Sequence, residues 1–172
     1  MSVMLYKLAG VVWVDENPRV LFRSKETARA LPMRSYDMEN PPRITDLDTV
    51  AMPRWALIDP RRYPASPHGA FFRERPVAPV AVSRGCPFRC TYCDRSVFRR
   101  TYRVNSPEYI YEHLRHLRQS FGVRHVNIYD DLFTLNRERI EELCRLLITT
   151  PLGMNFNCAV CVGHADDALL AL

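Results

Sequence analysis

The sequence predicts an α/β protein: a partial (β/α) TIM-type barrel of about three βα units, preceded by a β-hairpin and an extended, proline-rich arm. Between residues 76 and 172, apolar strand patterns alternate with amphipathic helix patterns, at intervals of about 30 to 40 residues that suit a βα unit. Such alternation gives parallel strands joined by helices. Upstream of residue 76 the pattern differs, with two short strands followed by many prolines.

The segment 1–27 is expected to form the β-hairpin. Its strands are Gly10–Val14 and Arg19–Phe22, with a turn at Asp15–Pro18 between them. We interpret this segment as a possible remnant of an upstream domain, for the reason given below.

The segment 28–75 is expected to be an extended linker arm. It holds most of the 13 prolines and shows no sustained period of 2 or 3.6 residues. Trp55 and the pair Phe71–Phe72 are large apolar side chains, and we expect them to anchor the arm on another surface.

The segment 76–172 is expected to be the barrel part. Its first strand, Val80–Val82, leads into a cysteine-rich loop. Ser106 is placed to cap a helix that starts with Pro107, and Gly122 can end that helix. A second strand is expected at 126–129 and a third at 154–160. Between them lies a helix whose apolar face is formed by Ile140, Leu143, Cys144 and Leu147. A last helix is expected to begin near Asp166.

Each of these strands carries reactive side chains at its carboxyl end. The cysteine loop follows the first strand, Asp130 and Asp131 follow the second, and Cys158 and Cys161 lie at the end of the third. Chemistry in barrels and open α/β sheets is located at this edge. We therefore expect one site there.

Composition excludes several classes of protein. The 172 residues are 47% hydrophobic and 25% charged, which is typical of a globular domain. No run approaches the roughly 18 apolar residues of a membrane span, and the N-terminal sequence lacks a secretory signal, so a cytoplasmic protein is expected. The net charge of +5 is spread among acidic residues, and nucleic acid is not expected as a partner.

The loop Cys86-Pro-Phe-Arg-Cys90-Thr-Tyr-Cys93 has the spacing C-x3-C-x2-C. Three thiolates can hold three irons of a [4Fe–4S] cluster and leave the fourth iron open, whereas clusters that only transfer electrons usually have four cysteines. An alternative is a zinc-stabilised binding module, in which Cys90 and Cys93 join Cys158 and Cys161 in a tetrahedral site.

This motif, with an aromatic residue before its last cysteine, resembles that of the radical S-adenosylmethionine (radical SAM) enzymes, over roughly residues 76 to 172. The resemblance implies that Cys86, Cys90 and Cys93 hold the cluster and that S-adenosylmethionine binds the open iron. Reductive cleavage of this cofactor then gives a 5′-deoxyadenosyl radical, which abstracts hydrogen from a substrate that the sequence does not identify. An electron donor for the cluster is implied as a partner.

The resemblance also implies cofactor-binding roles for Tyr92, beside the adenine, and for Asp130 and Asp131, beside the amino group of S-adenosylmethionine. Cys161 stands where related proteins often carry an arginine, so that contact is left unassigned. Helix capping or a turn is the alternative role for the two aspartates. No catalytic residue is assigned. The histidines at 113, 116 and 125 are expected on the surface or a helix face, without a role.

The arm, from Pro41 to Asp59, resembles the connector of the subgroup with a cobalamin-binding domain ahead of the radical core. The hairpin would then be the tail of that domain. No D-x-H-x-x-G cobalamin motif is present, so cobalamin is expected only if a further upstream domain exists.

A complete barrel of this kind takes roughly 250 residues. The sequence is therefore expected to be a fragment, or to complete its core with a partner chain. A cluster-binding fragment without turnover is a further alternative.

Overall fold

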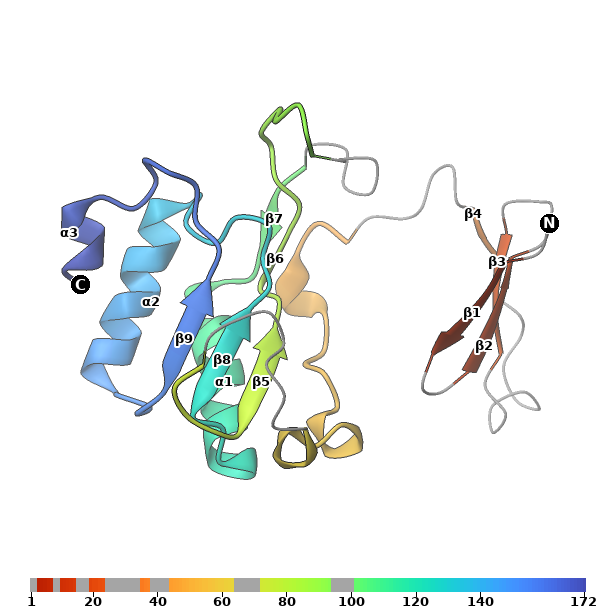
Figure 1. Cartoon of the computed structure of the whole chain (residues 1–172), viewed down its shortest axis with the longest axis horizontal. Helices are drawn as coiled ribbons and strands as arrows, with labels where there is room; N and C mark the ends of the chain where they lie inside the picture. Colours follow the sequence, from red (N-terminus) through yellow and green to blue (C-terminus); the bar gives the residue numbers. More distant parts are fainter. Residues whose placement is uncertain are drawn as a thin grey trace. The chain divides into compact units, whose positions relative to one another are not determined.

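A computed structural model of the chain describes residues 3–7, 10–14, 19–23, 35–37, 44–63, 72–93 and 101–172. The chain divides into two compact units, Met1–Ile44 and Thr45–Leu172 (Figure 1). The second unit holds the cysteine motif and every other predicted site residue. It also includes residues 45–63, which the sequence assigned to the linker arm.

The first unit contains a four-stranded antiparallel sheet in the order β1-β2-β3-β4. Strands β2 and β3 pair antiparallel, with Val14 opposite Val20, as expected for the hairpin. The predicted turn at residues 15–18 lies outside the described residues. The sequence did not predict β1 and β4, because neither shows a clear alternation. The four strands are β1 (Val3–Lys7), β2 (Gly10–Val14), β3 (Arg19–Arg23) and β4 (Ser35–Asp37).

The second unit is built on a parallel sheet of three strands, β5 (Val77–Val80), β8 (His125–Ile128) and β9 (Asn155–Cys158), in the order β5-β8-β9. The strands align with Ala78 opposite Val126 and Val126 opposite Phe156. The predicted α/β class with parallel strands is confirmed. In the described part of the chain the three strands form an open sheet (Figure 1).

The first strand of this sheet lies three residues before its predicted start. The sequence predicted it at Val80–Val82, because this short apolar run leads into the cysteine loop. Pro79 is tolerated because β5 is an edge strand of the described sheet, where a missing N–H need not interrupt pairing on both sides. Pro79 aligns with Asn127 in the register.

The helices begin and end where the caps predict. In α1 (Pro107–Phe121), the Ser106 hydroxyl accepts a hydrogen bond from Tyr109 N–H, and Gly122 closes the helix at φ +65°. Asn136 caps α2 (Arg137–Thr149), and Asp166 caps the short α3 (Asp167–Leu170). None of the helices in the described ranges combines the length and apolar character needed to cross a membrane.

The two faces of the sheet differ in chemistry because side chains alternate along each strand. One face packs against α1 and α2 in the core, through Ala78, Val80, Val126, Ile128, Ile110, Leu114, Leu117, Ile140 and Leu143. The opposite face is mixed, with Val77 and Pro79 of β5 beside His125 and Asn127 of β8. Asn157 Nδ2 donates to Asn127 Oδ1 across 3.2 Å, which links β9 to β8 on that face.

The described part of the arm packs on α1 through three short 3-10 helices, η1 (Leu47–Thr49), η2 (Trp55–Leu57) and η3 (Pro60–Arg62). Trp55 is buried in the core, as its predicted anchoring role requires, and its Nε1–H donates to His113 Nε2 at 2.8 Å. Asp48 Oδ1 accepts from Ser106 N–H at 3.0 Å, next to the start of α1. Phe71 lies outside the described residues, and Phe72 is half-buried.

The predicted surface or helix-face position is wrong for His125, which is buried in β8, whereas His113 lies on a face of α1 that is buried. His113 is 3% exposed and His125 is 2% exposed, whereas His116 is exposed. His113 is buried by Trp55, which comes from far upstream in the chain. His125 Nδ1 accepts from Arg73 N–H at 3.3 Å, and its ring lies edge-on to Phe72.

Because His113 is buried, we expect the protein to lose stability in mild acid. Burial, with a smaller contribution from His116, lowers the pKa of His113 from 6.5 to about 4. The unfolded chain therefore binds one more proton than the folded chain between these pH values. The free energy of unfolding should fall as the pH is lowered through this window, by about 2 kcal/mol between pH 7 and pH 5.

Urea unfolding at a series of pH values measures this effect. His113→Gln keeps an acceptor for Trp55 but cannot titrate, so it should flatten the pH dependence, while His116→Gln should leave it unchanged. Equal slopes in the wild type and His113→Gln would contradict the assignment.

Candidate functional site

The cysteine loop leaves the core between two very short strands. Strands β6 (Ser83–Arg84) and β7 (Arg103–Val104) pair antiparallel and close the base of the loop. Asn105 N–H donates to Val82 O at 2.9 Å just beyond this pair. Gly85 has φ +85° at the start of the loop, a conformation that glycine adopts without steric cost.

The three motif cysteines lie beyond this base and are accessible. Cys86 and Cys90 are partly exposed and Cys93 is exposed. A turn brings the last two together, with Cys93 N–H donating to Cys90 O at 3.3 Å. None of the chain's six cysteines, all within the described ranges, forms a disulfide. Cysteine thiolates are the soft ligands that iron–sulfur clusters use, and these three side chains are exposed enough to bind a cluster.

The described residues contain no group of three Cys, His, Asp or Glu side chains gathered closely enough to hold one metal ion. A tetrahedral zinc site needs all its ligands at bonding distance from a single ion. The alternative site of Cys90, Cys93, Cys158 and Cys161 is accordingly not assembled in this structure. A [4Fe–4S] cluster takes one thiolate per iron, so its ligands surround the cluster rather than converge on one ion.

The loop after β9 meets the cysteine loop at the same edge of the sheet. The Phe88 ring lies edge-on to His164, with their centroids 5.4 Å apart. His164 N–H donates to Cys161 O at 3.0 Å, which fixes the turn that follows β9. The convergence of strand ends that the sequence predicted is thus present for β5 and β9.

The two predicted aspartates have different environments. Asp130 is 4% exposed, and its Oδ1 accepts from Val82 N–H at 2.7 Å and from Ser83 N–H at 3.0 Å. Asp131 is exposed. Asp130 therefore holds the backbone that enters the cysteine loop. Its second oxygen, Oδ2, is buried and has no hydrogen-bond partner among the described residues, so it fits the role of accepting a donor from a bound molecule.

Arg139, on α2, is a buried cation that the sequence analysis missed. Its Nη2–H donates to Phe133 O at 2.9 Å, and Nη1 lies 3.4 Å from Val82 O and 3.5 Å from Asn105 O. These carbonyls belong to the segments on both sides of the cysteine loop and to the segment after Asp130. Burial lowers the pKa of Arg139, while the nearby Tyr102 and Asp130 oppose that shift. Arg139 thus ties these segments together and partly balances the charge of Asp130.

Tyr92 projects from the cysteine loop and is 91% exposed. A hydrogen bond with the Cys90 side chain, together with the nearby Cys93 and Cys161, raises the pKa of Tyr92. Cys158 lies nearer the core, and its pKa is raised by burial and by Asp130. Cys161 therefore neighbours the cysteine loop, and Cys158 neighbours the buried aspartate. Cys144 packs against the core, as predicted.

A known protein family combines a cysteine loop of this kind with a parallel sheet, and its sequence model matches this chain. The model of the radical SAM superfamily matches residues 80–171. The chain belongs to the radical SAM superfamily. This radical SAM domain covers β6, β7, β8, β9 and the three α-helices, together with the whole cysteine loop.

Relatives with assigned names support the same conclusion. The chain is 35% identical over 102 residues to an uncharacterized methyltransferase of Pyrococcus horikoshii, covering 58% of this chain and 21% of that protein. It is 33% identical over 107 residues to an anaerobic magnesium-protoporphyrin IX monomethyl ester cyclase of Cereibacter sphaeroides, covering 62% of this chain and 16% of the relative.

A more distant relative matches most of the chain. It is the cytidylyl-2-hydroxyethylphosphonate methyltransferase of Streptomyces wedmorensis, 25% identical over 181 residues, which covers 95% of this chain and 32% of that protein. The chain thus spans less than a third of the length of each of these three relatives. Their names place this radical SAM chain among enzymes.

Proposed function

We propose that this chain binds a [4Fe–4S] cluster through Cys86, Cys90 and Cys93, and that S-adenosylmethionine binds beside it. The observation that carries the proposal is the accessible three-cysteine loop at the carboxyl edge of a parallel sheet, in a chain of the radical SAM superfamily. When bound, this cofactor pair supplies a one-electron cleavage of the sulfonium that starts radical chemistry. An electron donor for the cluster would supply the electron.

The residues around the loop would position the cofactors. Gly85 lets the chain turn into the loop, and the pairing of β6 with β7 closes its base. Asp130 holds Val82 and Ser83 through Oδ1, and its Oδ2 would accept the ammonium group of S-adenosylmethionine. A carboxylate favours this cation electrostatically and as a hydrogen-bond acceptor.

Tyr92 and Asp131 have weaker proposed roles. Both are exposed, and both belong to segments at the same edge of the sheet. Tyr92 offers a flat ring beside the cluster ligands for the adenine to stack on. Asp131 would supply a second carboxylate close to the cofactor's amino group. Cobalamin enters the proposal only through an upstream domain, because the D-x-H-x-x-G motif is absent from these 172 residues.

Anaerobic reconstitution with iron and sulfide tests the proposed function. About four irons and four sulfides should bind per chain, as a cubane cluster requires. S-adenosylmethionine should then change the electron paramagnetic resonance spectrum of the reduced cluster, whereas S-adenosylhomocysteine, which lacks the sulfonium, serves as the control. Binding of one zinc per chain in place of iron would support the zinc-stabilised module instead.

A further inference from the structure

Tyr102 lies where the chain returns from the cysteine loop, directly before β7, and its side chain is partly buried. Its hydroxyl donates to Leu132 O at 3.1 Å, although 30 residues separate the two in sequence. Leu132 directly follows Asp130 and Asp131. This hydrogen bond therefore joins the exit of the cysteine loop to the segment that carries both predicted cofactor carboxylates.

The groups around the Tyr102 hydroxyl belong to the proposed site. Burial raises the pKa of Tyr102, and the nearby Arg139 opposes that shift. Asp130 and Cys86, the first cysteine of the motif, raise the pKa further. A phenol with a raised pKa is protonated at neutral pH. Its hydroxyl therefore remains a hydrogen-bond donor to Leu132 O under working conditions.

The segment after β8 is held from several sides. Asp130 Oδ1 accepts from the N–H groups of residues 82–83, where the chain enters the cysteine loop. Tyr102 holds the same segment from the exit of that loop. Phe133 N–H donates to Ala159 O at 3.0 Å, just beyond β9. The segment thus contacts both ends of the cysteine loop and the end of the neighbouring strand.

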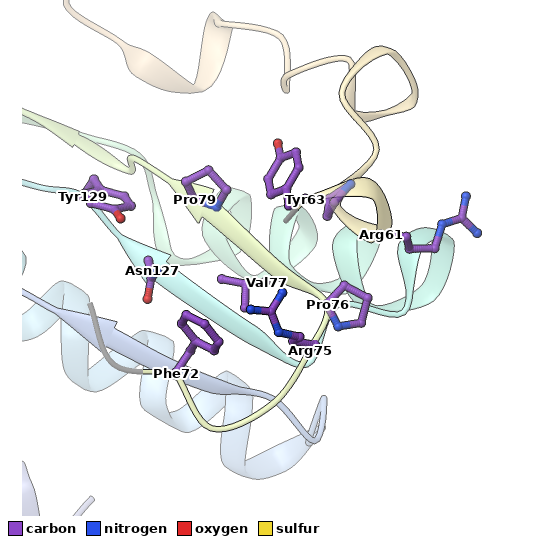
Figure 2. A pocket seen from close by; sticks show the side chains of 10 residues that line it. Arg61, Tyr63, Phe72, Arg75, Pro76, Val77, Pro79, Asn127 and Tyr129 are labelled. Atoms are coloured by element: carbon purple, nitrogen blue, oxygen red, sulfur yellow. The ribbon is translucent and has the colours of Figure 1, made fainter. Parts of the chain in front are cut away.

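Side chains of this segment face different sides of the sheet. Asn127 and Tyr129 line a cavity on the face opposite the core (Figure 2). Asp130, the next residue, is buried against the backbone that enters the cysteine loop. The side that each of these residues faces depends on how the backbone is held. The hydrogen bond from Tyr102 to Leu132 O, two residues later, helps to hold it.

We propose that Tyr102 is a positioning residue for S-adenosylmethionine. It fixes the separation between the cysteine loop and the carboxylates of Asp130 and Asp131, so that one bound molecule can reach both. Without the hydroxyl, the cofactor would have to order the segment as it binds, and such ordering reduces affinity. The inference rests on the proposed function for the identity of the bound molecule.

Tyr102→Phe tests the proposal because it removes the hydroxyl and keeps the ring. After reconstitution the variant should bind as much iron as the wild type. S-adenosylmethionine should still change the electron paramagnetic resonance spectrum of the reduced cluster. The concentration that gives half of this change should rise about fivefold, the factor expected for the loss of one hydrogen bond.

Tyr111→Phe is the matched control. The Tyr111 hydroxyl also donates to a backbone carbonyl, Thr150 O at 3.2 Å, but this bond lies at the end of α2 and away from the cysteine loop. The control should lose about as much stability in urea as Tyr102→Phe and respond to S-adenosylmethionine like the wild type. Equal responses of the two variants to the cofactor would limit Tyr102 to a stabilising role and overturn the proposal.

Hydrogen exchange on the full chain without iron tests the same contact independently. The N–H groups of Val82, Ser83 and Phe133 are donors in the contacts that hold the segment. Their exchange, measured by nuclear magnetic resonance, should be about fivefold faster in Tyr102→Phe. Tyr111→Phe should leave these three rates unchanged. Wild-type rates at all three positions in Tyr102→Phe would also overturn the proposal.

The two measurements separate this inference from the proposed function. If the wild type responds to S-adenosylmethionine and Tyr102→Phe responds equally well, the inference alone fails. If the wild type binds no iron, the proposed function fails, and the exchange rates decide whether Tyr102 positions the segment.

Discussion

Replacement of Cys86, Cys90 or Cys93 by alanine is expected to reduce cluster iron from about four per chain to near zero, because each thiolate would hold one iron. The far-ultraviolet circular dichroism should not change, since all three side chains are at least partly exposed and contribute little to the core. Iron and sulfide analysis after anaerobic reconstitution, together with the visible absorption of the cluster, measures the effect.

The cysteines outside the motif serve as controls, because they are the same residue type and two of them lie near the proposed site. Cys161 neighbours Tyr92 and the cysteine loop, and Cys158 neighbours Asp130. Alanine at either position should leave at least three of the four irons bound, and Cys144→Ala should retain the whole cluster. If Cys158→Ala or Cys161→Ala removed iron as completely as Cys90→Ala, the ligand assignment would be wrong.

Much of the core could be predicted because its signals are local. Ser106, Pro107 and Gly122 mark the ends of α1 through their own backbone preferences. Asp166 marks the start of α3 in the same way. The cysteine spacing identifies the loop without any tertiary information. Alternating strand and helix patterns then suffice to predict a parallel sheet.

Other features depend on contacts that are distant in sequence. The burial of His113 follows from Trp55, 58 residues upstream, and no local pattern around His113 reveals it. Arg139 resembles an ordinary helix arginine, and only its three carbonyl neighbours show that it ties the site together. The contact of Asp48 with Ser106 likewise joins the arm to the start of α1, and proline-rich segments give no periodic signal from which such packing could be predicted.

Asp130 and Asp131 are adjacent residues of the same type, so the same role was predicted for both. The structure distinguishes them because successive side chains at the end of β8 point in opposite directions. Tyr129 and Asp131 are exposed, while Asp130 is buried against the backbone of Val82 and Ser83. This difference changes what a substitution at each position should do.

Asp130→Ala is expected to be strongly destabilising. It leaves two buried N–H groups without an acceptor, at a cost of about 1–3 kcal/mol each, so the free energy of unfolding should fall by about 3 kcal/mol. The base of the cysteine loop loses its support at the same time, and the retained iron should fall. Urea unfolding and iron analysis measure the two effects.

Asp130→Asn separates support of the loop from cofactor binding. The asparagine oxygen can still accept from Val82 and Ser83, so it should recover most of the stability and iron that the alanine variant loses. It carries no charge for the cofactor's ammonium group, so the spectral response to S-adenosylmethionine should remain weak. Asp131→Ala, at an exposed position, should change stability by less than about 0.5 kcal/mol and weaken only the response to the cofactor. A normal spectral response in Asp130→Asn would mean that S-adenosylmethionine binds without the negative charge of Asp130. The role of Asp130 would then be limited to holding the cysteine loop.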